Sequence, residues 1–258
     1  MQAWIAGLEL APSTVAVVYG KLAAIFRAAE DDRVIARSPC TRRVRLPRQD
    51  GAEVVPMAPA QVRAMVDAVG DRYRALVVTL AGSGLRSGEA LGLTVDRCDF
   101  LRRTIRVDRQ LVTVANEPPR LAPVKTTASV RTIPVPQAVL DEIARHLDRY
   151  SPGPWGLIFT DGKGDPIRRN ALGHVWRRAA VRAGVDGFSP HDLRHYAASV
   201  LIDQGASVKA VQRHLGHASA TTTLDTYAHL WPDSEEVTRR ALDAGLAATL
   251  LAVAPTPI

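Results

Sequence analysis

Apolar side chains recur every three or four residues through most of this chain, which is the spacing of one face of an α-helix. The first such pattern predicts an amphipathic helix over residues 13–30, with Ser13 as its N-cap. Further helices are expected over residues 60–69, 72–81, 137–150, 170–183, 191–204, 208–215 and 234–250. The glycines at 82 and 84 break the third helix, and a short helix through Glu89 and Leu93 follows.

The period changes between residues 104 and 135, where apolar and polar positions alternate as they do in strands. The alternating runs are residues 104–107, 111–114 and 130–135, and prolines and an asparagine separate them. A further short strand is expected at residues 157–159. The fold class is therefore predicted to be mainly α with a small antiparallel β-sheet.

The stretch from residue 33 to residue 48 has a different composition from its neighbours. It holds six arginines, two prolines and no acidic residue. This composition predicts a basic, extended linker, although a charge run is often no more than a solvated loop. A boundary near Asp50 then divides the chain into residues 1–48, a small helical part with its linker, and residues 49–258, a larger domain.

Composition narrows the class of protein. The 258 residues are 47% hydrophobic and hold no apolar run near the ~18 residues of a membrane span, which excludes disordered and membrane-spanning classes. Two cysteines without C-x-x-C spacing, and an N-terminus without a signal-peptide pattern, favour a cytoplasmic protein. The net charge of +7 comes almost entirely from arginine, whose planar fork suits phosphate, so nucleic acid is an expected partner.

A histidine and an arginine are predicted to share the start of one helix. Ser189, Pro190 and Asp192 form a helix start, with serine as N-cap and aspartate in the capping-box position. His191 and Arg194 then lie three positions apart at the positive helix end, where an anion is favoured. Taken alone, the H-x-x-R spacing is weak, and an ordinary surface pair is the favoured interpretation.

A second candidate group lies at the end of the next helix. Gly216 is the expected left-handed C-cap of helix 208–215, and His217 stands just beyond it. Tyr227 follows ten positions later, after a threonine-rich segment that fits either a short helix or a mobile loop. The tyrosine could therefore be presented to a substrate, or serve as a core or surface anchor.

Two more cations stand in the first half of the larger domain. Arg86 lies at the glycine-rich turn between two helices, where it could aim rigidly or form a salt bridge with Glu89. Lys125 opens the run K-T-T-A-S-V-R-T-I-P at an expected hairpin tip, where a lysine is usually solvated.

Together these motifs closely resemble the tyrosine recombinase (phage integrase) family. The motifs are G-L-R-x-G-E, K-T-x-x-S-x-R-x-I-P, H-D-L-R-H and L-G-H-A-S with the trailing tyrosine, and they span about residues 59–230. Each is only moderately specific, but their order and joint occurrence are very specific. The resemblance implies a site-specific recombinase that cuts and rejoins DNA through a 3′-phosphotyrosine, without metal, ATP or another cofactor.

The resemblance also implies a role for each candidate residue. Tyr227 is the expected nucleophile and His191 the expected base, while Arg86 and Arg194 hold the phosphoryl oxygens. Lys125 is the expected acid that gives a proton to the departing 5′-oxygen. His217 is expected to donate a hydrogen bond to the scissile phosphate, and Glu89 is expected to support the site.

The implied partners are double-stranded DNA and further copies of the chain, as a homotetramer on paired sites, with possible DNA-bending or directionality factors and no membrane. The implied location is the cytoplasm, at the nucleoid. Residues 1–48 resemble only the last part of the family's helical core-binding domain, so a start further upstream or a shortened copy is expected. A non-catalytic DNA-binding remnant, a tyrosine-type topoisomerase and a generic arginine-rich helical protein remain as alternatives.

Overall fold

The computed structural model describes residues 1–41, 43–48, 53–231 and 235–251. The chain separates into two compact units, Met1–Ala52 and Glu53–Ile258. The expected start of the last helix at residue 234 lies outside the described residues.

The described residues of the first unit form two helices, α1 (Gln2–Ala6) and α2 (Pro12–Asp31). The expected cap at Ser13 is wrong, because Ala11 is the N-cap and Pro12 occupies the first helical turn. Proline suits that position, where its missing N–H would have had no partner. Among the described residues 33–48 there is neither helix nor strand, and Gln2 exchanges two hydrogen bonds with the backbone of Arg45.

The helices of the second unit match the expected ranges to within two residues at each end, except α10, for which the sequence left a helix and a loop open. They are α3 (Pro59–Ala68), α4 (Asp71–Ser83), α5 (Ser87–Leu91), α6 (Gln137–Arg149), α7 (Arg169–Ala183), α8 (Asp192–Asp203), α9 (Val208–Leu215), α10 (Ala220–Tyr227) and α11 (Glu235–Leu251). Helix α4 is central, because it packs against α3, α6 and α8. Its Leu76 and Leu80 are almost fully buried, so this helix anchors the main core.

The strands form two antiparallel sheets rather than one. Strands β1 (Cys98–Asp99), β2 (Thr104–Val107) and β5 (Arg131–Pro134) form a three-stranded sheet in the order β1-β2-β5. Strands β3 (Arg109–Val112) and β4 (Arg120–Pro123) form a separate hairpin.

Two strand predictions need correction. Lys125 follows β4, on the segment that leads to β5, and is not at a hairpin tip, because β4 and β5 belong to different sheets. Residues 157–159 are buried but form only an isolated bridge between Leu157 and Thr94 instead of a strand.

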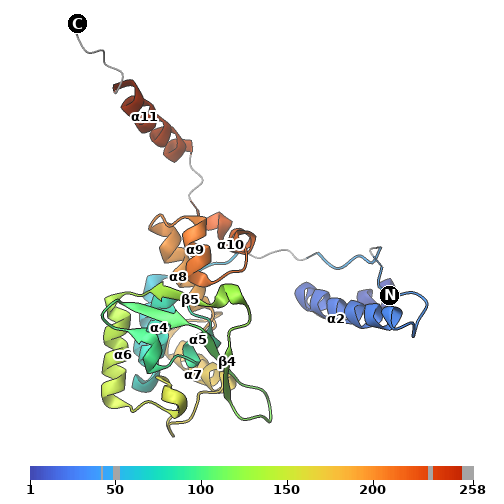
Figure 1. The fold of residues 1–258 in the computed structure, drawn as a ribbon, viewed down its shortest axis with the longest axis horizontal. Helices are drawn as coiled ribbons and strands as arrows, with labels where there is room; N and C mark the ends of the chain where they lie inside the picture. Colours follow the sequence, from blue (N-terminus) through green and yellow to red (C-terminus); the bar gives the residue numbers. More distant parts are fainter. Residues whose placement is uncertain (42, 49–52, 232–234, 252–258) are drawn as a thin grey trace. The chain divides into compact units, whose positions relative to one another are not determined.

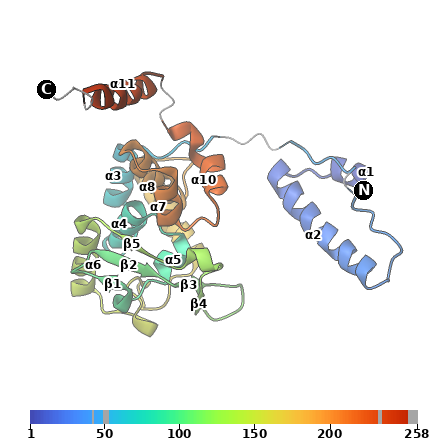
Figure 2. The ribbon, with the colours of Figure 1, turned by 45° about the horizontal axis from the view of Figure 1, so that its top comes forward.

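Helices α8, α9 and α10 lie together in one half of the second unit, and the three-stranded sheet lies with α6 in the other half (Figures 1 and 2). The helical half has its own small core, made by Ala198, Ile202, Val211, Leu215 and Tyr227. Helix α4 connects the halves, since it packs on both α6 and α8. No helix among the described residues is long and apolar enough to cross a membrane.

Candidate active site

A cleft of about 620 Å³ lies between the β3–β4 hairpin, α5 and the ends of α7, α8 and α9. Four of the six residues expected to be catalytic line it: Arg86, Lys125, His191 and His217. They come from positions up to 131 residues apart in the chain, so only the folded structure brings them together.

The Arg86 side chain is held by an ion pair and by a backbone carbonyl. Its Nη1 donates to Glu89 Oε1 at 2.8 Å and its Nη2 donates to the Gly216 carbonyl at 3.2 Å. The salt bridge with Glu89, one of the two alternatives for this arginine, is therefore present, and the Arg86 side chain is still 38% exposed. Arg86 can both hold Glu89 and reach a ligand in the cleft.

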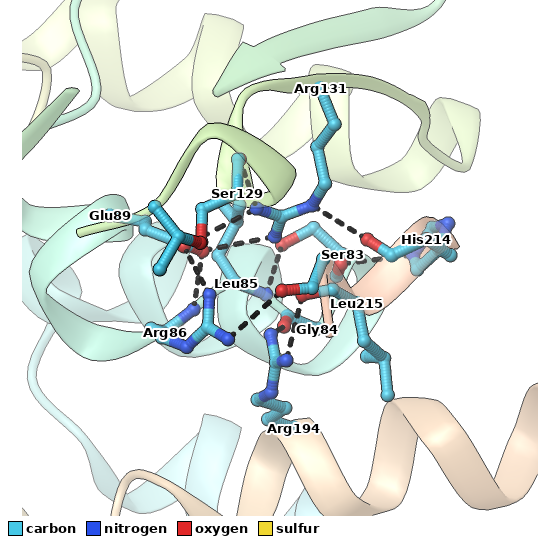
Figure 3. A network of polar contacts seen from close by, with 12 residues as sticks. Ser83, Gly84, Leu85, Arg86, Glu89, Ser129, Arg131, Arg194, His214 and Leu215 are labelled. Atoms are coloured by element: carbon cyan, nitrogen blue, oxygen red, sulfur yellow. Dashed lines mark hydrogen bonds and ion pairs between the residues drawn. The ribbon is translucent and has the colours of Figure 1, made fainter. Parts of the chain in front are cut away.

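Glu89 is the centre of a buried network that also holds Arg131, as Figure 3 shows. Arg131 donates to both carboxylate oxygens, at 3.0 and 3.3 Å, and its Nε donates to the His214 carbonyl at 2.8 Å. Burial acts to raise the pKa of Glu89, but the hydrogen bonds and charges of Arg131 and Arg86 outweigh it and lower the pKa. Glu89 is therefore ionised and links α5 to β5 and α9.

Arg194 lies behind the cleft and is 2% exposed. Its Nη1 donates to the Gly84 carbonyl and its Nη2 to the Leu215 carbonyl, both at 2.7 Å (Figure 3). These carbonyls stand at the C-terminal ends of α4 and α9, where helical carbonyls lack partners and carry partial negative charge. Burial and the charge of Arg86 lower the pKa of Arg194 to about 9, so it stays cationic at neutral pH.

His191 occupies the N-cap position of α8 and is exposed at the cleft wall. The predicted box is partly present: the Asp192 carboxylate accepts from the Ser189 backbone N–H at 2.7 Å, but the Ser189 hydroxyl also donates to that carboxylate instead of capping the helix. Partial desolvation, with His195 and Arg194 nearby, lowers the pKa of His191.

His217 follows the left-handed Gly216, which has a φ of +68° as expected for this C-cap. Its Nδ1 lies 2.9 Å from the Thr223 hydroxyl. Burial and the charges of Arg194 and Arg86 lower the pKa of His217 to about 4. The ring is therefore neutral at pH 7, and when Nδ1 accepts from Thr223 its Nε2 carries the proton as a hydrogen-bond donor.

Tyr227 ends helix α10, so the segment before it is a short helix rather than a loop. The side chain is 1% exposed, and its hydroxyl lies 2.8 Å from His195 Nδ1. Burial, partly offset by the charge of Arg194, raises the pKa of Tyr227 to about 12. The tyrosine is thus a buried neutral phenol in this conformation, not a residue displayed at the surface.

Sequence reasoning missed three residues that the structure places in or around this site. Arg131 belongs to the K-T-x-x-S-x-R motif, and its place in that motif was the available signal. Arg169 lines the cleft from the first turn of α7, and nothing in the sequence distinguishes it from the other arginines. His195 follows Arg194 directly and is the last residue of the H-D-L-R-H motif, and its place in that motif was the available signal.

The described residues contain no group of three or more histidine, cysteine, aspartate or glutamate side chains placed to hold a metal ion. The positive charge of the site comes from guanidinium groups and Lys125.

Residues 56–233 match the model of the phage integrase family. The chain belongs to this family. The match covers α3 to α10, and therefore includes every residue of the site.

Relatives in this family include a XerC-like tyrosine recombinase of Caldanaerobacter subterraneus, 28% identical over 85% of this chain and 63% of its own length. XerD of Corynebacterium glutamicum is 37% identical over 66% of this chain and 52% of its own length. The integrase of Mycobacterium phage L5 is 27% identical over 85% of this chain and 60% of its own length. The chain thus spans only about half to two thirds of the length of these family members.

Among solved structures, the integrase of transposon Tn1549 in complex with circular intermediate DNA has the same fold. Its TM-score is 0.79 with 24% sequence identity, over 95% of this chain and 84% of that one. The XerH recombinase bound to its difH substrate aligns with a TM-score of 0.58 and 17% identity, over 93% of this chain and 67% of that one. The mainly helical fold with small antiparallel sheets is therefore confirmed as that of this family.

Proposed function

We propose that this protein is a site-specific DNA recombinase that cuts and rejoins DNA through a 3′-phosphotyrosine, in the integration or excision of a mobile element. The observation that carries the proposal is the convergence of Arg86, Lys125, His191 and His217 on one cleft. Arg194 supports this cleft from behind, and Tyr227 lies beside it against His195 and His217.

The chemistry is a transesterification. The Tyr227 oxygen forms a bond to the scissile phosphorus, the bond to the 5′-oxygen breaks, and the phosphodiester energy is kept in the protein–DNA link. The reverse step, with a 5′-hydroxyl as nucleophile, rejoins the strand and frees the tyrosine. The cleavage and rejoining steps together consume no water and no nucleotide, and they need no metal.

The cations act on the charge that develops at phosphorus. Arg86 lines the cleft and is held in place by Glu89 before the reaction, so it stabilises the phosphoryl oxygens without reorganising. Arg194, bound to helix-end carbonyls behind the cleft, adds its positive charge to the field at the phosphate. Lys125 is exposed on the cleft wall and serves as the acid for the 5′-oxygen. Neutral His217 donates a hydrogen bond to the phosphate. His191, on the cleft wall, accepts or donates protons at the phosphate.

The proposal includes the partners of the reaction. Double-stranded DNA is supported by the net charge of +7 and by the Tn1549 and XerH complexes with DNA. Residues 49–258 act as the catalytic domain, and residues 1–48 as part of a core-binding domain with a basic linker. Active complexes are homotetramers on paired sites, with accessory bending or directionality factors where direction is controlled.

The test is covalent capture of DNA in cells. The protein and its Tyr227→Phe variant are expressed, the lysate is denatured, and DNA that stays linked to protein is sequenced. We expect adducts at a defined sequence that depend on Tyr227. Tyr150→Phe is the matched control, because Tyr150 lines a different pocket, with Asp71 and Arg145, and its ring keeps the Arg72 guanidinium 4.1 Å above its centroid.

Adducts that persist in Tyr227→Phe, or that disappear equally in Tyr150→Phe, would refute the assignment of the nucleophile. Strand exchange that requires two copies of the recovered sequence distinguishes recombination from supercoil relaxation by a tyrosine-type topoisomerase.

A further inference from the structure

Within the described part of the chain, the Tyr227 hydroxyl has one hydrogen-bond partner, His195 Nδ1, at 2.8 Å. The two rings also meet edge to face, with centroids 5.6 Å apart. The tyrosine ring also stacks on His217, with centroids 6.4 Å apart and planes 9° apart. The nucleophile therefore contacts the rings of two histidines, and of these two only His195 bonds its oxygen.

Helix geometry explains how His195 reaches the tyrosine while its neighbour reaches the cleft. His191 and His195 are one turn apart on α8, and their rings are in edge contact at 5.1 Å. His191, at the start of the helix, lines the cleft. His195, one turn further in, is half-buried against Tyr227 of α10.

We propose that His195 positions the Tyr227 hydroxyl and receives its proton as the tyrosine attacks phosphorus, while His191 acts at the phosphate. The proposal rests on the recombinase function proposed above and divides its acid–base chemistry between two histidines. In the forward step the O–H bond of Tyr227 breaks, the proton moves to Nδ1 of His195, and the oxygen electron pair forms the bond to phosphorus. In the reverse step His195 returns the proton to the departing phenolate.

The surroundings of His195 suit both states of this transfer. Burial and the charge of Arg194 lower the pKa of His195, so its neutral form is present to accept at neutral pH. Asp192 acts in the opposite direction and stabilises the imidazolium once it forms. The charged and titratable groups that face His195 are His191, Asp192 and Arg194 of α8, Tyr227 of α10, and His217.

The first test needs no DNA. Nitrogen-15 NMR of the full chain reports which ring nitrogen of His195 carries the proton. We expect the Nε2–H form, with an Nδ1 shift typical of an acceptor, and we expect Tyr227→Phe to change that shift. A proton on Nδ1, or an Nδ1 shift that does not respond to Tyr227→Phe, would overturn the proposal whatever the function of the protein.

The second test measures the rate of adduct formation on a nicked duplex that carries the sequence recovered by covalent capture. His195→Asn keeps an oxygen that can accept the hydroxyl hydrogen bond near the position of Nδ1, but it cannot take the proton. We expect adduct formation to slow at least 10-fold, to regain rate as the pH rises from 7 to 9, and to lose the acidic limb seen with the unmodified protein. His174→Asn, on the exposed face of α7, is the matched control and should keep the normal rate and profile.

A His195→Asn rate and pH profile equal to those of the unmodified protein would overturn the role of His195 as proton acceptor. A slowed rate with an unchanged profile would also overturn it, since that result indicates a structural role only. If the unmodified protein forms no adduct, the proposed function fails, while the NMR result still decides whether His195 holds the hydroxyl as an acceptor.

Discussion

Replacing Glu89 with glutamine tests how much the buried network stabilises the larger unit. The Glu89 side chain is 3% exposed and its partner Arg131 is 7% exposed, so the substitution leaves a buried guanidinium without its counter-charge. Loss of one partner of a buried ion pair costs about 3–5 kcal/mol. Glutamine can still accept from the Arg86 backbone N–H, which Glu89 does at 3.0 Å, so the cap of α5 is kept. We therefore expect the free energy of unfolding to fall by an amount near the lower limit, about 3 kcal/mol, which lowers the folded-to-unfolded ratio roughly 100-fold.

Urea unfolding followed by tryptophan fluorescence measures this loss, because Trp176 is buried in the main core. Glu142→Gln is the matched control: Glu142 is also buried, but its partners Arg74 and Arg145 are 34% and 63% exposed and remain hydrated. We expect Glu142→Gln to lower the free energy of unfolding by less than about 1 kcal/mol.

The pH dependence gives a second check on the same substitution. The pKa of Glu89 is lower in the folded protein than in the unfolded chain, where it is about 4.3. The stabilisation that ionised Glu89 gives the folded state is therefore complete above about pH 4.3, and it is lost as the pH falls through the folded pKa. The difference between the unmodified protein and Glu89→Gln should then narrow as the pH falls below about 4. A loss below about 1 kcal/mol at pH 7, or equal losses for both variants, would refute the reasoning.

Two further predictions concern the turns and the histidine of the site. Gly84→Ala should destabilise the second unit by about 1–3 kcal/mol in the same urea assay, because φ is +62° and an added Cβ would lie 3.0 Å from Leu215 Cδ2 and 3.2 Å from Ala197 Cβ. Gly205→Ala shares the positive φ but meets open space, so its loss should be smaller; equal losses would mean that crowding at Gly84 contributes nothing. His217 should titrate by NMR with a midpoint of about 4, and Arg86→Met should raise that midpoint, since burial and then the charges of Arg194 and Arg86 lower the pKa. A midpoint near 6.5 in the unmodified protein would contradict both the burial and the charge argument.

Local patterns predicted most of the helices because a helix depends on neighbours three and four positions away. Helix α9 begins and ends where its serine cap and its left-handed glycine predicted, since both caps act on their own first or last turn. The strands were less predictable. Whether β4 pairs with β3 or with β5 depends on long-range partners, and the structure placed β5 beside β2 instead.

The sequence by itself determined the family, the helical plan and the identity of the candidate residues, because short motifs and periodicity are written in adjacent positions. Only the tertiary structure decided how those residues meet. Arg194 donates to carbonyls at the C-terminal ends of α4 and α9, which lie 110 and 21 residues away in the sequence. Arg131 pairs with Glu89, which is 42 residues away. The contact of His195 with Tyr227 depends on α8 packing against the segment that ends α10, and no local pattern specifies that packing because it results from burial of a shared core.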